Sequence, residues 1–382
     1  MLDQPDPTIW LVTGSHQLRS YLQRPADWQL TLFPCAADAF IPAVDGGQTY
    51  TTPLVGHPAT ATRLIDQAGE LQDGPTGTLD HRLADDDTMP MGLFRPSGDG
   101  HYQLYLHVGV YAGRVRFLKL PAAPLTLAEA GPALIAAIDE HYLKVNNFLC
   151  FRLNLRPEIE LEHKFTITSD PDVYQLARAL VREVSTGQLP GVVLEIREEL
   201  QHWDFLNHLY SITAPEDQVG YVSFIPTTDG CYTVKRKQFA ADTDERPEQR
   251  RSGTEIPSGD LAGYVRDELG LASDWNASFR RIRYDVFVEM IESGNGYGIA
   301  FDRCTVTDEQ GNRIDGLPEL LQCEIEYVYS VALDGTELDS VRADLARLVE
   351  LISDYLDRHG VTSYQQHESK LTFLRNLHVP AR

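Results

Sequence analysis

The segment EIELEHKF, residues 158–165, alternates strictly between charged and mainly apolar positions. Side chains of a strand point alternately to opposite faces, so Glu158, Glu160, Glu162 and Lys164 share one face. Carboxylates this close repel one another, and a solvated outer face is the simplest arrangement that tolerates them. The alternative is a site for Mg²⁺ or Mn²⁺, because these ions prefer hard oxygen ligands and relieve the repulsion.

Length, composition and charge limit the class of protein. A chain of 382 residues is long enough for two domains that each bury a sizeable core. The hydrophobic fraction of 42% is typical of soluble globular proteins. The formal net charge of -23 argues against a protein that coats nucleic acid or anionic membrane, since such binding depends on clustered Lys and Arg. We therefore expect no nucleic-acid partner and no membrane partner, and a polyanionic ligand must meet a local basic pocket.

Two further features concern the compartment. The 5 cysteines have no CxxC or Cys/His spacing, and their odd number favours reduced thiols. The N-terminal sequence MLDQPDPTIW lacks the basic and apolar regions of a signal peptide, and no apolar run approaches membrane-spanning length. The sequence thus predicts a cytoplasmic protein.

The pattern of elements changes near residue 150. Residues 1–150 mix short strand patterns with Gly, Pro and Asp and then show a helical pattern at 126–145, which predicts an α+β domain of unknown function. Residues 151–382 carry longer alternating strands and few helices, which predicts a mostly antiparallel β domain.

Three segments of the second part are not strand-like. A helix is predicted at 169–184, with Ser169 or Asp170 as its N-cap, and a final helix at 337–360. The segment 240–259 is polar and rich in turn formers, so the sequence predicts a loop.

Several other strands of the second part place charges at every second position. The charged positions that share faces or interrupt apolar strands are Lys235, Lys237, Arg281, Arg283, Asp302, Glu324 and Glu326. Acidic and basic faces on different strands favour a closed barrel with charges inside and an apolar exterior. A phosphate chain bridged to the carboxylates by Mg²⁺ or Mn²⁺ fits such an interior, because Arg and Lys bind phosphate oxygens.

The segment ELEHK at 160–164 resembles the ExExK signature that opens the CYTH domain of the triphosphate tunnel metalloenzyme family. The lysine, arginine, aspartate and EIE strands then follow in that family's order. The segment ESKLTFL at 368–374 is similar to the one that closes many members. The resemblance spans about residues 151–382. It implies an eight-stranded antiparallel tunnel with flanking helices that binds a triphosphate-containing small molecule.

The resemblance also implies a role for each matching position. The catalytic residues would be Glu160, Glu162 and Lys164. The ligands of Mg²⁺ or Mn²⁺ would be Glu160, Glu162 and Glu326, with Glu324 and Asp302 as further ligands. The residues that bind the phosphates would be Lys164, Lys235, Lys237, Arg281, Arg283 and Lys370.

Two positions depart from the family pattern. The segment GYVSFI at 220–225 has no basic residue where the family usually carries an arginine pair, and Arg250 and Glu255 align only loosely with an arginine-glutamate strand. The leading hypothesis is a metal-dependent triphosphatase acting on tripolyphosphate, thiamine triphosphate or a nucleoside triphosphate. A class IV type adenylyl cyclase is one alternative. A catalytically impaired tunnel that binds polyphosphate or nucleotide as a regulatory module is another. The oligomeric state stays open, with a homodimer among the alternatives.

Overall fold

The computed structural model describes residues 8–20, 22–36, 39–40, 49–53, 55–82, 88–111, 114–146, 152–195, 200–331, 333 and 336–377. The chain divides into two compact units, called here the N-terminal unit and the barrel unit. The N-terminal unit comprises Met1–Leu153, Met290–Asn295 and Tyr329–Glu337, and the barrel unit comprises Asn154–Glu289, Gly296–Val328 and Leu338–Arg382. The domain boundary predicted at residues 150 and 151 lies outside the described residues.

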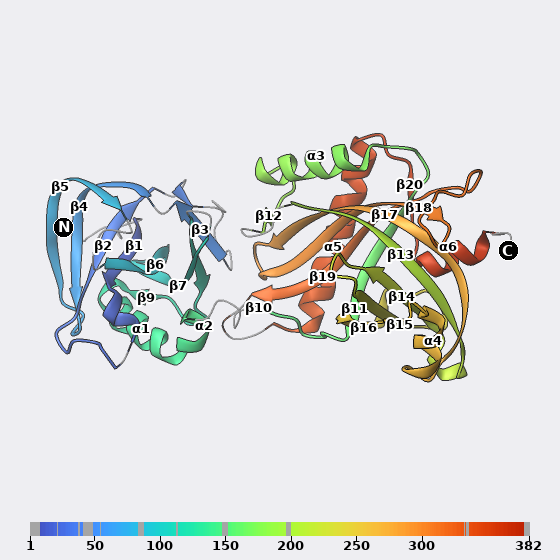
Figure 1. The fold of residues 1–382 in the computed structure, drawn as a ribbon. Coiled ribbons are helices and arrows are strands. Elements are labelled where there is room, and N and C mark those ends of the chain that lie inside the picture. Colours follow the sequence, from blue (N-terminus) through green and yellow to red (C-terminus); the bar gives the residue numbers. More distant parts are fainter. Residues whose placement is uncertain are drawn as a thin grey trace. The chain divides into compact units, whose positions relative to one another are not determined.

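The N-terminal unit is built on one antiparallel sheet in the order β3-β8-β7-β6-β1-β2-β4-β5, with β9 paired to β7 (Figure 1). Its helices α1 (Leu127–Glu140) and α2 (Tyr142–Asn146) take the place of the single helix predicted at 126–145. Buried aromatic and aliphatic side chains such as Leu11, Tyr105 and Phe117 form its core. The unit is therefore the α+β domain that the sequence predicts. Its strands are β1 (Ile9–Ser15), β2 (Gln29–Cys35), β3 (Thr49–Pro53), β4 (Val55–Asp66), β5 (Leu71–Arg82), β6 (Thr88–Gly98), β7 (His101–Tyr111), β8 (Arg114–Lys119) and β9 (Leu125–Thr126).

The barrel unit contains a closed antiparallel barrel of eight strands. The order β19-β18-β17-β13-β14-β15-β16-β11 closes because β11 pairs with both β16 and β19. Closure leaves no free strand edge, and alternate residues of each strand face the interior. The predicted eight-stranded tunnel is confirmed as an architecture. Its strands are β11 (Ile159–Ile167), β13 (Leu200–Ala214), β14 (Gly220–Pro226), β15 (Tyr232–Gln238), β16 (Glu245–Thr254), β17 (Ala272–Met290), β18 (Asn295–Thr307) and β19 (Leu320–Val331).

Strand β16 overturns the loop predicted at 240–259. It pairs with β11 on one side and with β15 on the other. The sequence hides this strand because both of its faces are polar, so no alternation of apolar residues marks it. Gly253 has a φ of 68° near the shift in register between β15 and β16, which explains why turn formers occur inside a strand.

Helices α3 (Val173–Ser185) and α5 (Leu338–Arg358) pack on the outside of the barrel (Figure 1). The hydroxyl of Tyr297 in β18 donates to the carbonyl of Val341 in α5 at 2.6 Å. The N-cap of α3 is Asp172, and the prediction of Ser169 or Asp170 is wrong. The Asp172 carboxylate accepts hydrogen bonds from the first-turn amides at 2.9 and 3.2 Å, because it directly precedes the first helical residue.

The short helix α6 (Lys370–Asn376) packs against the barrel. Leu371 and Leu374 of α6 pack with Leu209, Phe279 and Leu320 of the barrel strands in one buried apolar cluster. The smaller elements of the unit are α4 (Leu261–Asp267), β12 (Val192–Leu194), which pairs with β17, and β20 (Ser363–Gln365), which pairs with β11. In the described part of the chain, every helix is too short or too polar to span a membrane.

Candidate functional site in the barrel interior

Strand β11 turns Glu160, Glu162 and Lys164 toward the barrel interior. Across the ladder with β19, Glu162 is paired with Glu326, and Lys164 is paired with Glu324. Directly paired residues lie on the same face of a sheet, so the carboxylates of both strands share the interior. Glu158 precedes β11 and is exposed, which leaves it outside this row.

Two lysines of β15 meet the carboxylates at one side of the interior, in what we call the lysine cluster. Lys237 forms an ion pair with Glu160 and lies 3.2 Å from the carboxylate of Glu248. Lys235 lies 3.0 Å from the other oxygen of Glu248. Glu248 belongs to β16, so it was not among the predicted site residues.

The lysine cluster has an excess of negative charge beside Glu326. Burial, together with the neighbouring Glu160 and Glu248, raises the pKa of Glu326 to about 8. Burial also opposes ionisation of Glu248, but the ammonium groups of Lys237 and Lys235 outweigh it and lower the pKa of Glu248 to about 2. These carboxylates are therefore held unequally: Glu248 pairs with both lysines, whereas burial and the neighbouring carboxylates outweigh the same lysines at Glu326.

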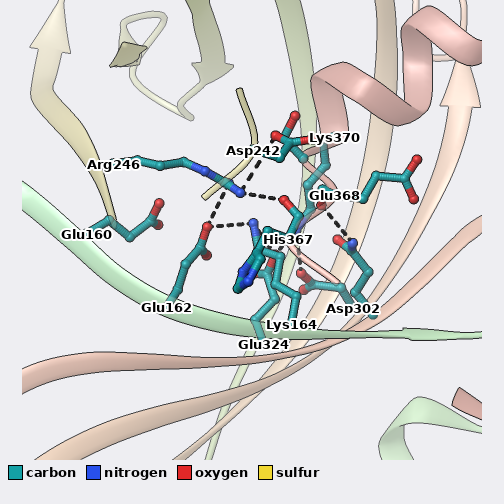
Figure 2. A network of polar contacts seen from close by, with 12 residues as sticks. Glu160, Glu162, Lys164, Asp242, Arg246, Asp302, Glu324, His367, Glu368 and Lys370 are labelled. Carbon is teal, nitrogen blue, oxygen red and sulfur yellow. Dashed lines mark hydrogen bonds and ion pairs between the residues drawn. The ribbon is translucent and has the colours of Figure 1, made fainter. Parts of the chain in front are cut away.

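Glu162 connects the two sides of the interior (Figure 2). Its carboxylate lies 2.6 Å from the ammonium of Lys164 and accepts a hydrogen bond of 2.8 Å from Arg246. Arg246 is buried, and its guanidinium also donates to the carbonyl of His367 in the C-terminal segment. Arg246 belongs to β16, so it too was missed when this segment was predicted as a loop.

A second group, called here the arginine cluster, surrounds Asp302 and Glu324. Arg283 donates to both oxygens of Asp302 at 2.7 and 2.9 Å, and Arg281 contacts Asp302 and lies 2.9 Å from Glu324. Lys370 of α6 lies 3.2 Å from Asp302 and also contacts Glu324. Burial raises the pKa of Asp302, whereas Lys370, Lys164 and Arg283 outweigh burial at Glu324 and hold its pKa well below the ordinary value.

The C-terminal segment delivers Lys370 into the barrel. Ser369 is the N-cap of α6, and its hydroxyl accepts a hydrogen bond of 3.1 Å from the amide of Thr372. The side-chain amide of Gln322 in β19 donates to the carbonyl of Glu368 at 3.1 Å. These contacts fix the helix start, so that its first residue points toward the carboxylates (Figure 2).

The interior encloses a cavity of about 580 Å³. All the predicted phosphate-binding residues line it, namely Lys164, Lys235, Lys237, Arg281, Arg283 and Lys370. Glu160, Glu324 and Glu326 line it as well, whereas Glu162 and Asp302 are buried and are not among the described residues that line it. The structure therefore brings predicted residues of five separate elements, β11, β15, β17, β19 and α6, together around one cavity.

A divalent cation needs several oxygen ligands close together. Within the described ranges, no three His, Cys, Asp or Glu side chains are arranged closely enough to hold a metal ion. The donor chemistry of Glu160, Glu248 and Glu326 nevertheless fits Mg²⁺ or Mn²⁺, since these ions prefer carboxylate oxygens and the charges of Glu160 and Glu248 help burial to raise the pKa of Glu326. Asp302 and Glu324 fit less well, because arginines and Lys370 already occupy their oxygens.

Comparisons with known proteins give only distant similarities. No family model and no curated protein matches the chain. The solved structure of the PH1819 protein from Pyrococcus horikoshii OT3 has 16% sequence identity and a TM-score of 0.34, and covers 56% of this chain and 98% of its own. A putative adenylyl cyclase, HpAC1, from Hippeastrum, described as having a dominant triphosphatase activity, has 14% identity and a TM-score of 0.31, and covers 57% and 95%. The S. pombe Pct1 RNA triphosphatase has 15% identity and a TM-score of 0.26, and covers 57% and 92%. Similarities this weak carry no argument about activity, which must come from the site.

Proposed function

We propose that the barrel unit is a metal-dependent triphosphatase, with residues 151–382 as its domain. The observation that supports this most directly is one cavity lined by seven Lys and Arg side chains, the six predicted ones and Arg250, together with carboxylates. A chain of phosphates carries the charge that such cations bind, and the carboxylates supply oxygen ligands for Mg²⁺ or Mn²⁺. The substrate would be tripolyphosphate, thiamine triphosphate or a nucleoside triphosphate.

In this proposal each cluster has its own task. Arg281, Arg283 and Lys370 bind phosphate oxygens from one side, and Lys235 and Lys237 bind them from the other. Lys164 lies between the two clusters, 2.6 Å from Glu162 and 3.4 Å from Glu324, where it would balance the charge on the phosphoryl group that is attacked. These Lys and Arg side chains contact carboxylates, for example Lys237 with Glu160 and Arg283 with Glu324. A bound phosphate chain would replace these carboxylates as the partners of the cations.

Glu160 and Glu326 would hold the metal, with Glu248 as an added candidate. Glu162 would join them by exchanging its present partners, Lys164 and Arg246, for the ion. The ion, when bound, supplies positive charge that offsets carboxylate repulsion and charge on the phosphoryl oxygens. Glu324 and Asp302 would mainly orient Arg281 and Arg283, since these ion pairs fix both guanidinium groups. Water attacks the terminal phosphorus, the P–O bond to the bridging oxygen breaks, and the products are phosphate and the shortened chain.

A product assay tests the proposal. Purified protein is incubated with Mg²⁺ or Mn²⁺ and tripolyphosphate, thiamine triphosphate or ATP, and phosphate, pyrophosphate and cyclic AMP are measured separately. Release of phosphate that stops when metal is chelated supports a triphosphatase. Cyclic AMP with pyrophosphate would instead identify a cyclase, and stabilisation by ligand without product would identify a binding module.

A further inference from the structure

One wall of the cavity carries no charge. Strands β13 and β14 contribute nine residues there, all neutral, whereas other strands of the barrel and α6 contribute the cations and carboxylates. The absence of arginine from the GYVSFI strand is part of this pattern. The neutral residues are Gln201, Trp203, Phe205, Asn207, Leu209, Tyr221, Ser223, Ile225 and Pro226.

Two aromatic rings of this wall lie beside the arginines of the arginine cluster. In the ladder between β13 and β17, Trp203 pairs with Arg283, and Phe205 pairs with Arg281. Directly paired side chains lie within contact distance on the same face, and the guanidinium carbon of Arg281 is 5.9 Å from the centre of the Phe205 ring. A group held at this wall would therefore adjoin the phosphates that the arginines hold.

Trp203 is unusually accessible for a residue that lines a cavity. The residue is 48% exposed, although covering the apolar surface of an indole ring lowers the free energy. A phosphate chain has no apolar surface, so it would leave this ring uncovered.

The size of the cavity also exceeds what a bare phosphate chain needs. Pockets of roughly 300 to 1,000 Å³ accommodate drug-sized organic ligands, and the 580 Å³ found here falls in that range. The neutral polar groups of Asn207, Ser223 and Gln201 supply donors and acceptors on the same wall. These features favour an organic group with a flat ring and a few polar atoms.

We propose that the uncharged wall binds the aromatic group of a triphosphate ester, and that Trp203 and Phe205 determine specificity for such esters over inorganic tripolyphosphate. The inference rests on the proposed function, because it takes the phosphates to lie at the arginine cluster. The aromatic ring stacks on Trp203, while Phe205 supports both the ring and Arg281.

The test compares Trp203→Ala with a matched tryptophan variant, Trp275→Ala. Trp275 belongs to β17, is 37% exposed and is not among the described residues that line the cavity. For each protein, kcat/KM is measured with ATP, thiamine triphosphate and tripolyphosphate in the presence of Mg²⁺. The rise in melting temperature caused by ATP or tripolyphosphate at equal concentration is measured in parallel.

Loss of ring stacking should reduce kcat/KM of Trp203→Ala for the aromatic substrates about tenfold more than for tripolyphosphate, whereas Trp275→Ala should not change the ratio. An equal loss on all three substrates would mean that Trp203 has only a structural role, and would overturn the inference. If the wild type turns over no substrate, the proposed function fails, but the melting temperatures still decide the inference. ATP must then stabilise the wild type more than tripolyphosphate does, and Trp203→Ala must abolish that difference; equal stabilisation would refute it.

Discussion

The two bidentate ion pairs of β17 allow a direct test of how the barrel interior is stabilised. Arg283 binds Asp302, whose side chain is fully buried, with contacts of 2.7 and 2.9 Å. On the opposite face of β17, Arg280 binds Asp204 with contacts of 2.7 and 2.6 Å, but these two side chains are 59% and 33% exposed. The geometry is nearly the same, and the surroundings differ.

Replacing Asp302 by Asn should destabilise the barrel unit far more than replacing Asp204 by Asn. Removing one partner of a buried ion pair costs about 3–5 kcal/mol, because the remaining charge is left without compensation. Glu324 still contacts Arg281, Arg283 and Lys370, so we expect the lower end, about 3 kcal/mol. The exposed pair should contribute about 0.2–1 kcal/mol, since water already solvates both groups.

Hydrogen exchange of the β17 and β18 amides, followed by mass spectrometry in metal-free buffer, measures this barrel independently of the N-terminal unit. The protection of these amides should fall about 100-fold in Asp302→Asn and less than about fivefold in Asp204→Asn. Similar small effects in both variants would contradict the reasoning, since they would mean that the interior charges are solvated like surface charges.

Three further predictions follow from single contacts. In metal-free buffer the free energy of unfolding should decrease as the pH rises toward about 8, because the pKa of Glu326 is raised in the folded state above its ordinary value of 4.5. The stability that protonated Glu326 contributes is complete below the unfolded pKa and is lost as the pH rises through the folded pKa. Glu326→Gln should therefore flatten the profile of unfolding free energy, measured with urea, between about pH 5 and 9. Arg246→Met removes a buried partner of Glu162 and of the His367 carbonyl, so it should lower the midpoint of urea unfolding by an amount equivalent to about 3 kcal/mol. An unchanged midpoint would mean that Lys164 alone neutralises Glu162. Asp172→Ala removes the N-cap of α3 and should lower the free energy of unfolding by about 1 kcal/mol, whereas Asp170→Ala, at a position that the sequence favours, should leave the cap intact. A larger loss of stability in Asp170→Ala than in Asp172→Ala would contradict the assignment of Asp172 as the N-cap.

The barrel could be predicted from the sequence because its key strands combine an alternating charged face with an apolar face. That period of two placed Glu160, Glu162 and Lys164 on one face, and the same pattern identified the lysine and arginine strands. The ExExK resemblance then supplied the order of the strands. The sequence predicts a closed barrel, but only the structure shows that β11 closes it by pairing with β19, since pairing between distant strands leaves no local pattern.

Two parts of the site escaped prediction for different physical reasons. Arg246 and Glu248 lie in β16, whose outer face is as polar as its inner face. The only sequence signal for a strand is that charged residues recur at every second position, at Arg246, Glu248 and Arg250. Trp203 and Phe205 carry no charge, and a search for catalytic or metal-binding residues has no reason to select them. Their importance appears only when β13 is found beside the arginines of β17.

The most direct test of the proposed function is metal-dependent phosphate release by the wild type, by Glu160→Gln/Glu162→Gln and by Glu245→Gln. Glu245 lies on the neighbouring strand but pairs with Arg156 and Arg342, away from the cavity lining, so Glu245→Gln controls for the loss of a paired carboxylate. We predict turnover in the wild type and in Glu245→Gln, and none in the double variant. Circular dichroism of the double variant should show that it is folded. Undiminished turnover in a folded double variant would contradict the assignment of the barrel interior as the active site.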